Sequence, residues 1–250
     1  HGFEVKSDFL NNKLANFKSG NNSSFEPRDV VLYGFGRIGR LAARELIKQA
    51  GRGQQLRLRA IVTRSSSEAD LIKRAALLKN DSVHGINGQV VKMICAKNPE
   101  DIDYTEYDIN NALVIDNTGA FTTKEALSRH LQAKGTSRVL LTAPGKEIPN
   151  IVYGINQEGL NLTNQKIFSA ASCTTNAISP VLKVIEDNYG VVKGHIETVH
   201  AYTNDQNLLD NMHKKPRRGR SAAINMVITS NKPMFWKRVF LIFKSISIFF

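Results

Sequence analysis

The sequence predicts an α/β protein built around a parallel β-sheet, and two observations carry this prediction. Between residues 29 and 150, short apolar runs alternate with amphipathic helical segments, as they do where helices join parallel strands. The first apolar run leads directly into the glycine-rich turn "GFGRIG", after which a helical pattern begins. Together they predict a doubly wound sheet with helices on both faces.

The elements are expected in a regular order along the chain. Strands are expected over residues 30–33, 56–62, 112–116 and 138–141, and a short strand after Lys166 leads to Ser169. Helices are expected over residues 41–49 and 68–78, and another, preceded by a capping box of Thr122 and Glu125, ends near Ala133. The run "VVKGHIETVHAY", residues 191–202, alternates apolar and polar residues and predicts a strand of a second sheet.

The composition limits the classes of function. The 250 residues carry a formal charge of +12, which favours anionic ligands, either nucleic acid or phosphorylated small molecules. The dense basic run is "KKPRRGR", residues 214–220. Two cysteines, Cys95 and Cys173, are too few for a disulfide framework and indicate a reducing compartment. No signal peptide is visible and no metal site is expected, since His195 and His200 would face opposite sides of a strand.

The glycine-rich turn has the spacing of a phosphate-binding loop. Gly34 would form the tight turn, Gly36 would let a pyrophosphate approach the backbone, and Gly39 would let the helix pack on the strand. The free N–H groups and the positive dipole end of the helix favour an anion there. We therefore expect a dinucleotide-binding Rossmann domain over residues 25–150. The alternative is a tight strand–helix turn without a ligand.

The second expected strand ends without the acidic residue that usually holds the ribose hydroxyls. That position has Thr63, followed by Arg64. An arginine there can accept a 2′-phosphate, so the expected cofactor is NAD or NADP, without a strong preference for NAD. The alternative is that Arg64 is an ordinary solvated charge.

Cys173 is expected at the exposed start of a helix. The stretch "SAASCTTNAISPVL", residues 169–182, places it after four small residues and before an apolar helical pattern. Exposed amides and the helix dipole favour the thiolate, which is the nucleophilic form of cysteine. His200, in the strand expected over residues 191–202, could return beside the helix as a base. The alternative is a buried cysteine and a core histidine.

Five motifs together resemble the glyceraldehyde-3-phosphate dehydrogenase family. They are "GFGRIGR", "NDSVHG", "ASCTTN", "TVHAYT" and "LLDNMHKKPRRGRSAA", and the N-terminal stretch is most similar to the longer bacterial form. The resemblance extends roughly from Phe25 to Ser230. It implies a cytoplasmic, homotetrameric oxidoreductase of glycolysis and gluconeogenesis that uses NAD or NADP and takes a triose phosphate and inorganic phosphate.

The resemblance also implies roles for individual residues. Cys173 matches the nucleophile that becomes a thioester, and His200 matches the base that activates it. Positions that match cofactor contacts are Arg37, Ile38, Lys97 and Thr142. Positions that match substrate or phosphate contacts are Ser172, Thr174, Thr203 and Arg218. Asp210 and Arg220 match a pair that shapes the neighbouring loop, so "KKPRRGR" is interpreted as facing phosphate rather than nucleic acid.

The chain departs from the family pattern in two places. "SVHG", residues 82–85, runs directly into "INGQVVKMI" where the family has a longer stretch, so an internal deletion is expected. After Ser230 the family continues with more phosphate contacts and most of a mixed catalytic sheet, whereas this chain has a tail rich in Phe, Ile and Lys over residues 231–250. We therefore expect an extension over residues 1–24, a partial catalytic α+β domain over 151–230, and a truncated, inactive chain.

Other functions stay open. Oxidation of erythrose 4-phosphate would use the same Cys173 and His200. A remnant without activity could still bind a dinucleotide, and a nucleic-acid binder could use residues 214–220. A membrane anchor in the tail is not expected, because its apolar runs are far shorter than the roughly 20 residues that a spanning helix needs.

Overall fold

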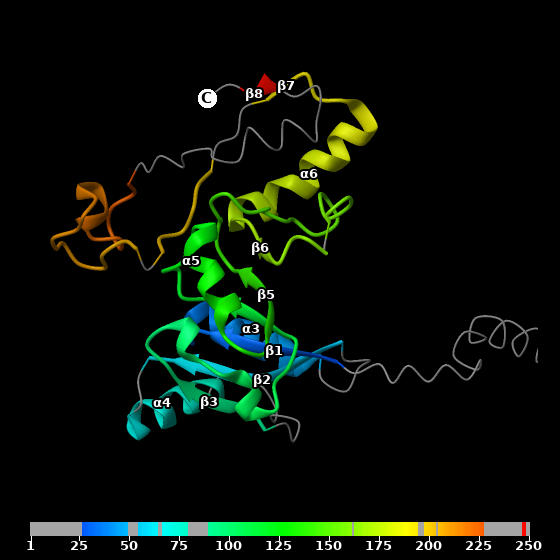
Figure 1. The fold of residues 1–250 in the computed structure, drawn as a ribbon. Coiled ribbons are helices and arrows are strands. Elements are labelled where there is room, and N and C mark those ends of the chain that lie inside the picture. Colours follow the sequence, from blue (N-terminus) through cyan, green and yellow to red (C-terminus); the bar gives the residue numbers. More distant parts are fainter. Residues whose placement is uncertain are drawn as a thin grey trace, which may run out of the picture. The chain divides into compact units, whose positions relative to one another are not determined.

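The computed structural model describes two compact units. The described residues are 27–49, 55–64, 67–79, 90–161, 163–194, 198–203, 205–227 and 247–248. The first unit takes in the chain as far as Ile151 together with Leu160–Ser172, and the second takes in Val152–Gly159 and the chain from Cys173 onward (Figure 1). The extension expected over residues 1–24 lies outside the described residues, as does the tail apart from Ser247–Ile248.

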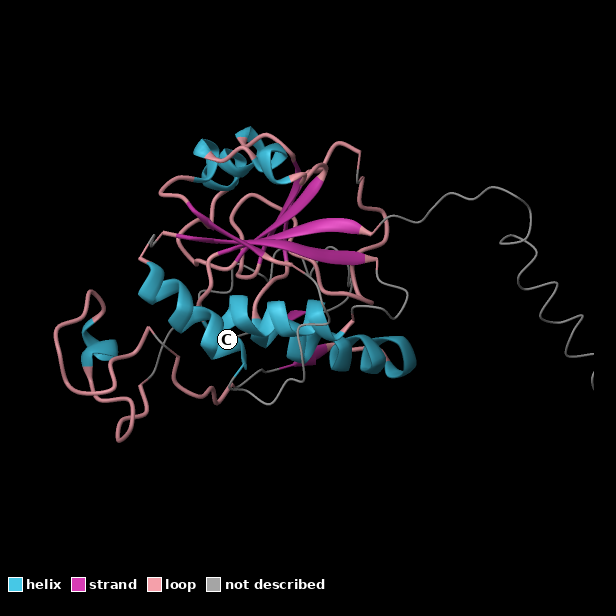
Figure 2. Cartoon of the chain, turned by 90° about the horizontal axis from the view of Figure 1, so that it is seen from below, coloured by secondary structure: helices cyan, strands magenta, loops and turns pink. Residues whose placement is uncertain are grey.

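The first unit is built on a six-stranded sheet in which all neighbouring strands are parallel. Its strands are β1 (Arg28–Tyr33), β2 (Leu56–Thr63), β3 (Lys92–Cys95), β4 (Ala112–Asp116), β5 (Thr136–Leu141) and β6 (Ile167–Ser169). They lie in the order β3-β2-β1-β4-β5-β6, and Figure 2 shows how they twist relative to one another. The order runs outward in both directions from β1, which confirms the predicted doubly wound sheet.

Helical segments connect the first five of these strands along the chain. They are α3 (Arg37–Lys48), α4 (Glu68–Lys79), η1 (Pro99–Asp101), η2 (Tyr104–Tyr107), α5 (Lys124–Ser128) and η3 (Arg129–Gln132), where η denotes a 3₁₀ turn. The helix that the sequence predicts up to Ala133 is therefore an α-helical turn that tightens into a 3₁₀ turn.

The two faces of the sheet bury alternate residues of the same strand. In β1, Val31 and Tyr33 belong to one apolar cluster, whereas Val30 and Leu32 belong to another. Side chains of a strand point alternately to its two faces, so β1 is buried on both sides. α3 covers the second cluster, and residues 102–109 cover the first. This explains why the central strands read as continuous apolar runs in the sequence.

The N-cap of α5 differs from the predicted one. The Thr123 hydroxyl oxygen accepts a hydrogen bond from the Ala126 N–H at 3.2 Å, so Thr123 caps the helix and the predicted capping box of Thr122 is wrong. Instead, the Thr122 carbonyl oxygen accepts a hydrogen bond from the Lys146 N–H at 2.8 Å. The backbone of Thr122 is therefore engaged by a neighbouring segment, and the helix begins one residue later.

The second unit contains α6 (Cys173–Tyr189), β7 (Lys193–Gly194), η4 (Pro216–Gly219) and β8 (Ser247–Ile248). β7 and β8 form a two-residue parallel pair. The long strand predicted over residues 191–202 does not form as predicted: residues 195–197 lie outside the described residues, and residues 198–203 have no regular secondary structure. A strand needs a partner for its N–H and C=O groups, and no described strand pairs with residues 198–203.

Candidate active site and dinucleotide turn

Cys173 is the first residue of α6, and its side chain is exposed. The preceding residues form a sharp turn in which Ala171 has a φ of 60°, in the left-handed region. The Ser169 hydroxyl stabilises that turn, because it accepts a hydrogen bond from the Ala171 N–H at 3.0 Å and donates one to the Ala143 carbonyl at 2.6 Å. The helix therefore begins at the cysteine, as the small residues before it predict.

His200 lies beside Cys173 in the second unit. Its Nε2 atom is 3.3 Å from the Cys173 Sγ atom. Its Nδ1 atom lies 2.5 Å from the Ala201 carbonyl oxygen. A carbonyl only accepts hydrogen bonds, so Nδ1 carries the hydrogen and the neutral ring turns the lone pair of Nε2 toward the sulfur. The ring is thus oriented to take the proton of the thiol.

The pair favours the charged form of both groups. The hydrogen bond with His200 is the largest effect on the Cys173 thiol and lowers its pKa from the ordinary 9.0, while partial burial opposes the shift. The hydrogen bond to the Ala201 carbonyl is the largest effect on His200 and, with the contact to Cys173, raises its pKa from 6.5. The two shifts converge on a thiolate beside an imidazolium, which is the reactive state of a Cys–His pair.

The glycine-rich turn follows β1 in the first unit, and its three glycines differ in their surroundings. Gly34 has a φ of 92°, and a Cβ atom there would lie 2.8 Å from the Thr118 Cγ2 atom. A Cβ atom on Gly39 would collide with the Gly34 carbonyl oxygen. A Cβ atom on Gly36 would meet nothing within 4 Å, so open space lies beside the N-terminus of α3. The turn itself requires Gly34 and Gly39, whereas Gly36 leaves room for a ligand.

The other expected cofactor residues lie at the carboxyl edge of the same sheet. Arg37 and Ile38 are exposed in the first turn of α3. Arg64 directly follows β2 and Lys97 follows β3, and both side chains are exposed. Thr142 follows β5 and donates from its N–H and hydroxyl, at 3.1 and 3.0 Å, to the last carbonyl oxygen of β4. The strand order reverses between β1 and β4, which is where doubly wound sheets bind ligands.

The structure does not join the residues expected to bind phosphate through hydrogen bonds or ion pairs among the described residues. Ser172 and Thr174 flank Cys173 in sequence and are partly buried, and Thr203 is exposed. The Arg218 Nη1 atom lies 2.6 Å from a carboxylate oxygen of Asp205. Within the described part of the chain, no hydrogen bond or ion pair joins Arg218 to Thr203 or to Cys173.

Asp205 is a residue that the sequence reasoning missed. Besides Arg218, it faces the His213 Nε2 atom at 3.7 Å and the Lys215 Nζ atom at 4.0 Å. The Asn207 N–H donates to the Arg218 carbonyl at 3.0 Å and closes the loop around this group. The available signal was that two carboxylates, Asp205 and Asp210, shortly precede the basic run "KKPRRGR". Part of the charge of that run is therefore neutralised within the loop.

Asp210 does not pair with Arg220 as the resemblance implies. Its Oδ1 atom accepts a hydrogen bond from the Ser221 N–H at 2.8 Å. The Arg220 side chain is exposed, and the ion pairs of the described residues do not include it. A backbone N–H next to Arg220 thus satisfies the carboxylate, which closes this end of the loop without a second charged side chain.

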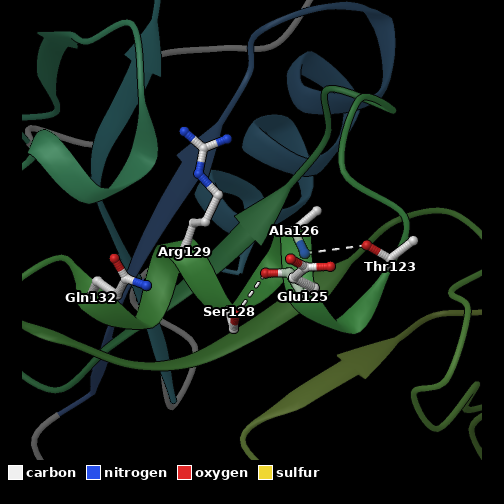
Figure 3. A pocket seen from close by; sticks show the side chains of 6 residues that line it. All are labelled: Thr123, Glu125, Ala126, Ser128, Arg129 and Gln132. Carbon is white, nitrogen blue, oxygen red and sulfur yellow. Dashed lines mark hydrogen bonds between the residues drawn. The ribbon is translucent and has the colours of Figure 1, made fainter.

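A shallow surface pocket lies beside α5 (Figure 3). Its lining residues are Thr123, Glu125, Ala126, Ser128, Arg129 and Gln132. Two of its polar side chains are engaged within the protein, since the Ser128 hydroxyl donates to the Glu125 carbonyl at 2.6 Å and Arg129 pairs with Glu100 at 2.7 Å. None of the expected functional residues lines it, so we assign it no function.

Two further properties of the described residues concern metal binding and membrane crossing. They bring together no group of three or more His, Cys, Asp or Glu side chains that could hold a metal ion. Among the helices formed by these residues, none has the length and apolar character needed to cross a membrane.

The fold and the site define a class of protein. The first unit has a Rossmann-like α/β fold with a G-x-G-x-x-G turn at the point where the strand order reverses. The second unit presents a thiol whose pKa is lowered by a neighbouring histidine. The class is thus one that combines a dinucleotide-type fold with an activated cysteine.

Comparisons with known proteins show which proteins this chain resembles. Residues 172–242 match the family described as "Glyceraldehyde 3-phosphate dehydrogenase, C-terminal domain". The chain is 54% identical over 240 residues to a glyceraldehyde-3-phosphate dehydrogenase-like protein of Pseudomonas aeruginosa, covering 89% of this chain and 52% of that protein. It is 39% identical over 216 residues to a glyceraldehyde-3-phosphate dehydrogenase of Streptomyces coelicolor, covering 80% and 61%. Glyceraldehyde-3-phosphate dehydrogenase 2 of Trichormus variabilis is 38% identical over 211 residues, covering 80% and 62%.

These matches confirm the family resemblance found in the motifs. Over the region that it spans, this chain is homologous to the glyceraldehyde-3-phosphate dehydrogenases. It spans between 52% and 62% of the length of the three relatives named above. The family match continues to residue 242, beyond Ser230, where the motifs led us to expect the resemblance to end.

Proposed function

We propose that this chain carries the dinucleotide-binding and thiol-bearing parts of an enzyme that oxidises glyceraldehyde 3-phosphate to an acyl phosphate. The observation that carries the proposal is the 3.3 Å contact between the Cys173 Sγ and His200 Nε2 atoms. The names of the relatives support it, since each is called a glyceraldehyde-3-phosphate dehydrogenase or a protein like one. The proposed partners are therefore a triose phosphate and inorganic phosphate.

The Cys–His pair supports covalent chemistry on a carbonyl. The Cys173 thiolate would form a C–S bond to the aldehyde carbon, and the carbonyl oxygen would take up the proton that the thiol had given to His200, which gives a hemithioacetal. When the C–H hydrogen leaves with its electron pair, the hydroxyl proton would pass to His200 Nε2 and a thioester to Cys173 would remain. Attack by inorganic phosphate on that thioester would break the C–S bond and release the thiolate. A bound nicotinamide dinucleotide supplies the hydride acceptor for the oxidation.

The first unit has the features that such a dinucleotide requires. Gly36 leaves its Cβ position empty beside the start of α3, so the backbone N–H groups there can approach a pyrophosphate. Arg37 and Ile38 would border the pyrophosphate, and Lys97 and Thr142 lie at neighbouring strand ends. The same fit serves NAD and NADP, which differ only by the 2′-phosphate on the adenosine ribose.

Arg64 is proposed to recognise that 2′-phosphate, because its side chain is exposed directly after β2. An acidic residue at the end of this strand would repel the phosphate, whereas an arginine can pair with it. Calorimetric titration with NAD and NADP would test this. We expect Arg64→Ala to weaken NADP binding about tenfold or more and to leave NAD binding unchanged. Arg57→Ala, at the opposite end of β2, is the control. A clear preference for NAD that Arg64→Ala does not alter would contradict the role of Arg64.

The thiol chemistry is tested by substrate protection. Glyceraldehyde 3-phosphate should slow the alkylation of Cys173 by iodoacetamide, because the hemithioacetal occupies the sulfur. Cys95, which is exposed at the end of β3, should show no protection and serves as the internal control. Equal protection of both cysteines, or of neither, would contradict the proposal.

We expect this chain alone to show no significant turnover of glyceraldehyde 3-phosphate with phosphate and either dinucleotide. The chain spans about half of its Pseudomonas aeruginosa relative, and the loss of one orienting or electrostatic contact commonly costs about 10²-fold or more in rate. Turnover within tenfold of a full-length relative, abolished by Cys173→Ser, would contradict this expectation. If there is turnover, its dependence on phosphate and a comparison with erythrose 4-phosphate as substrate would separate the two possible oxidations.

A further inference from the structure

A buried pair of hydrogen-bonding side chains, Asp116 and His130, joins the end of β4 to η3, and the proposed thiol chemistry does not use it. Asp116 and His130 are 0% and 1% exposed, and the Asp116 Oδ2 atom lies 2.9 Å from the His130 Nε2 atom. A buried carboxylate needs hydrogen-bond donors. The Thr118 N–H and hydroxyl supply two more, at 2.8 and 2.7 Å from Oδ1. Asp116 is thus held by three donors.

These hydrogen bonds fix the turn that follows β4. The Asn117 N–H donates to the Tyr33 carbonyl at 2.8 Å and ties the turn to the end of β1. Gly34 packs directly on the turn, since a Cβ atom there would lie 2.8 Å from the Thr118 Cγ2 atom and 3.2 Å from the Thr118 nitrogen. The position of the glycine-rich turn therefore depends on the turn that Asp116 holds.

His130 also contacts the end of β1 through its ring. The Tyr33 and His130 ring centroids are 4.6 Å apart in an edge-on arrangement, and the Phe121 ring lies 5.6 Å from His130. Burial, followed by the charge of Asp116, raises the pKa of Tyr33 to about 12, so Tyr33 stays neutral. His130 therefore joins the ends of β1 and β4, the two strands between which the order of the sheet reverses.

We propose that His130 is a positioning residue for dinucleotide binding. A carboxylate only accepts hydrogen bonds, so the His130 Nε2 atom donates to Asp116 and holds the Asn117–Thr118 turn against Gly34. This arrangement presets the glycine-rich turn for a pyrophosphate. The inference rests on the proposed dinucleotide-binding function, and His130 itself, being buried, acts through the turn rather than by touching the ligand.

Two substitutions separate the hydrogen bond from the ring. His130→Phe keeps the aromatic packing and removes the donor, whereas His130→Gln removes the ring and keeps an N–H donor that can reach Asp116. In calorimetric titrations of the full chain with NADP and NAD, we expect His130→Phe to weaken binding about tenfold or more and His130→Gln to stay within about threefold of the wild type. Arg129→Gln, the preceding residue in η3, is the control and should bind as the wild type does.

The outcomes distinguish positioning from stability and from the proposed function. Wild-type affinity in His130→Phe, or equal losses in both His130 variants, would overturn the proposal. If His130→Phe does not fold, the double variant Asp116→Asn/His130→Phe takes its place in the titration. This variant also removes the buried carboxylate that would have lost its bond to His130. If the wild type binds neither dinucleotide, the proposed function fails. In that case the NMR amide signals of Gly34 and Thr118 decide whether His130 positions the turn, since they should shift in His130→Phe and remain in His130→Gln.

Discussion

The Nε2 atom of His200 lies 3.3 Å from the sulfur of Cys173, and its other ring nitrogen is bonded to the carbonyl oxygen of Ala201. The orientation of the ring is therefore set by the backbone of the next residue and not by a carboxylate side chain. Because Nδ1 must donate to that carbonyl, the neutral ring can only accept at Nε2. The reactivity of Cys173 should thus depend directly on His200.

The alkylation rate of Cys173 should reach its plateau at a lower pH than that of an unperturbed thiol. The thiolate fraction rises as the pH passes through the thiol pKa, and His200 lowers that pKa. His200→Ala removes the largest cause of the shift, so the profile should move to higher pH. Iodoacetamide labelling followed by peptide mapping gives the profile, with Cys95 in the same sample as reference. Equal labelling of both cysteines in folded protein, or a profile that His200→Ala does not move, would contradict this prediction.

Replacing Ala171 with glycine should raise the free energy of unfolding by about 0.5–1 kcal/mol, because a residue with a Cβ atom pays a penalty in the left-handed region. Ala171 has a φ of 60°, and glycine adopts this value freely. Ala177→Gly, at an exposed position within α6, is the matched control and should lower stability by about 0.5–1 kcal/mol. Urea denaturation measures both. A loss of stability in Ala171→Gly would show that the relief of backbone strain at this turn does not outweigh the greater freedom of glycine in the unfolded chain.

Gly36→Ala should weaken dinucleotide binding without lowering stability, whereas Gly39→Ala should lower stability. Gly36→Ala places a methyl group in open space, so stability should be unchanged while dinucleotide affinity falls. Gly39→Ala forces a Cβ atom against the Gly34 carbonyl oxygen and should cost about 1–3 kcal/mol of stability. Denaturation curves and calorimetric titrations on the same two samples distinguish these effects. If Gly36→Ala binds both dinucleotides as tightly as the wild type, no ligand approaches the backbone there.

Thr123→Ala should cost about 1 kcal/mol of stability, because it removes the hydroxyl that caps α5. Thr122→Ala removes a neighbouring hydroxyl that does not cap the helix, so its effect should be smaller. The comparison by urea denaturation is sharp because the two residues are adjacent and chemically identical. A larger loss in Thr122→Ala would restore the capping box that the sequence suggested.

The sequence predicted best what depends on local pattern. The apolar strand 30–33 and the turn "GFGRIG" identified β1 and the start of α3, because burial on both faces and tight turns leave a direct mark on residue choice. The strand predicted over residues 191–202 was not confirmed, because an alternating pattern does not supply the neighbouring strand that a sheet requires.

The sequence did not reveal contacts between side chains from separate segments. Asp116 and His130 are joined only when η3 packs beside β4, and neither residue belongs to a motif with a fixed spacing. Asp205 likewise meets Arg218 only because the intervening loop folds back. In contrast, Cys173 and His200 were found from the motifs around them, and the structure brings them together.

The loop that contains Arg218 carries its own counter-ion. Asp205 is covalently attached near Arg218, His213 and Lys215, so its effective concentration at these cations is on the order of millimolar or higher. A free anion must compete with that tethered carboxylate before it can pair with Arg218. The positive charge of the run "KKPRRGR" therefore overstates the attraction of this loop for polyanions, and dilute phosphate should leave Arg218 paired with Asp205.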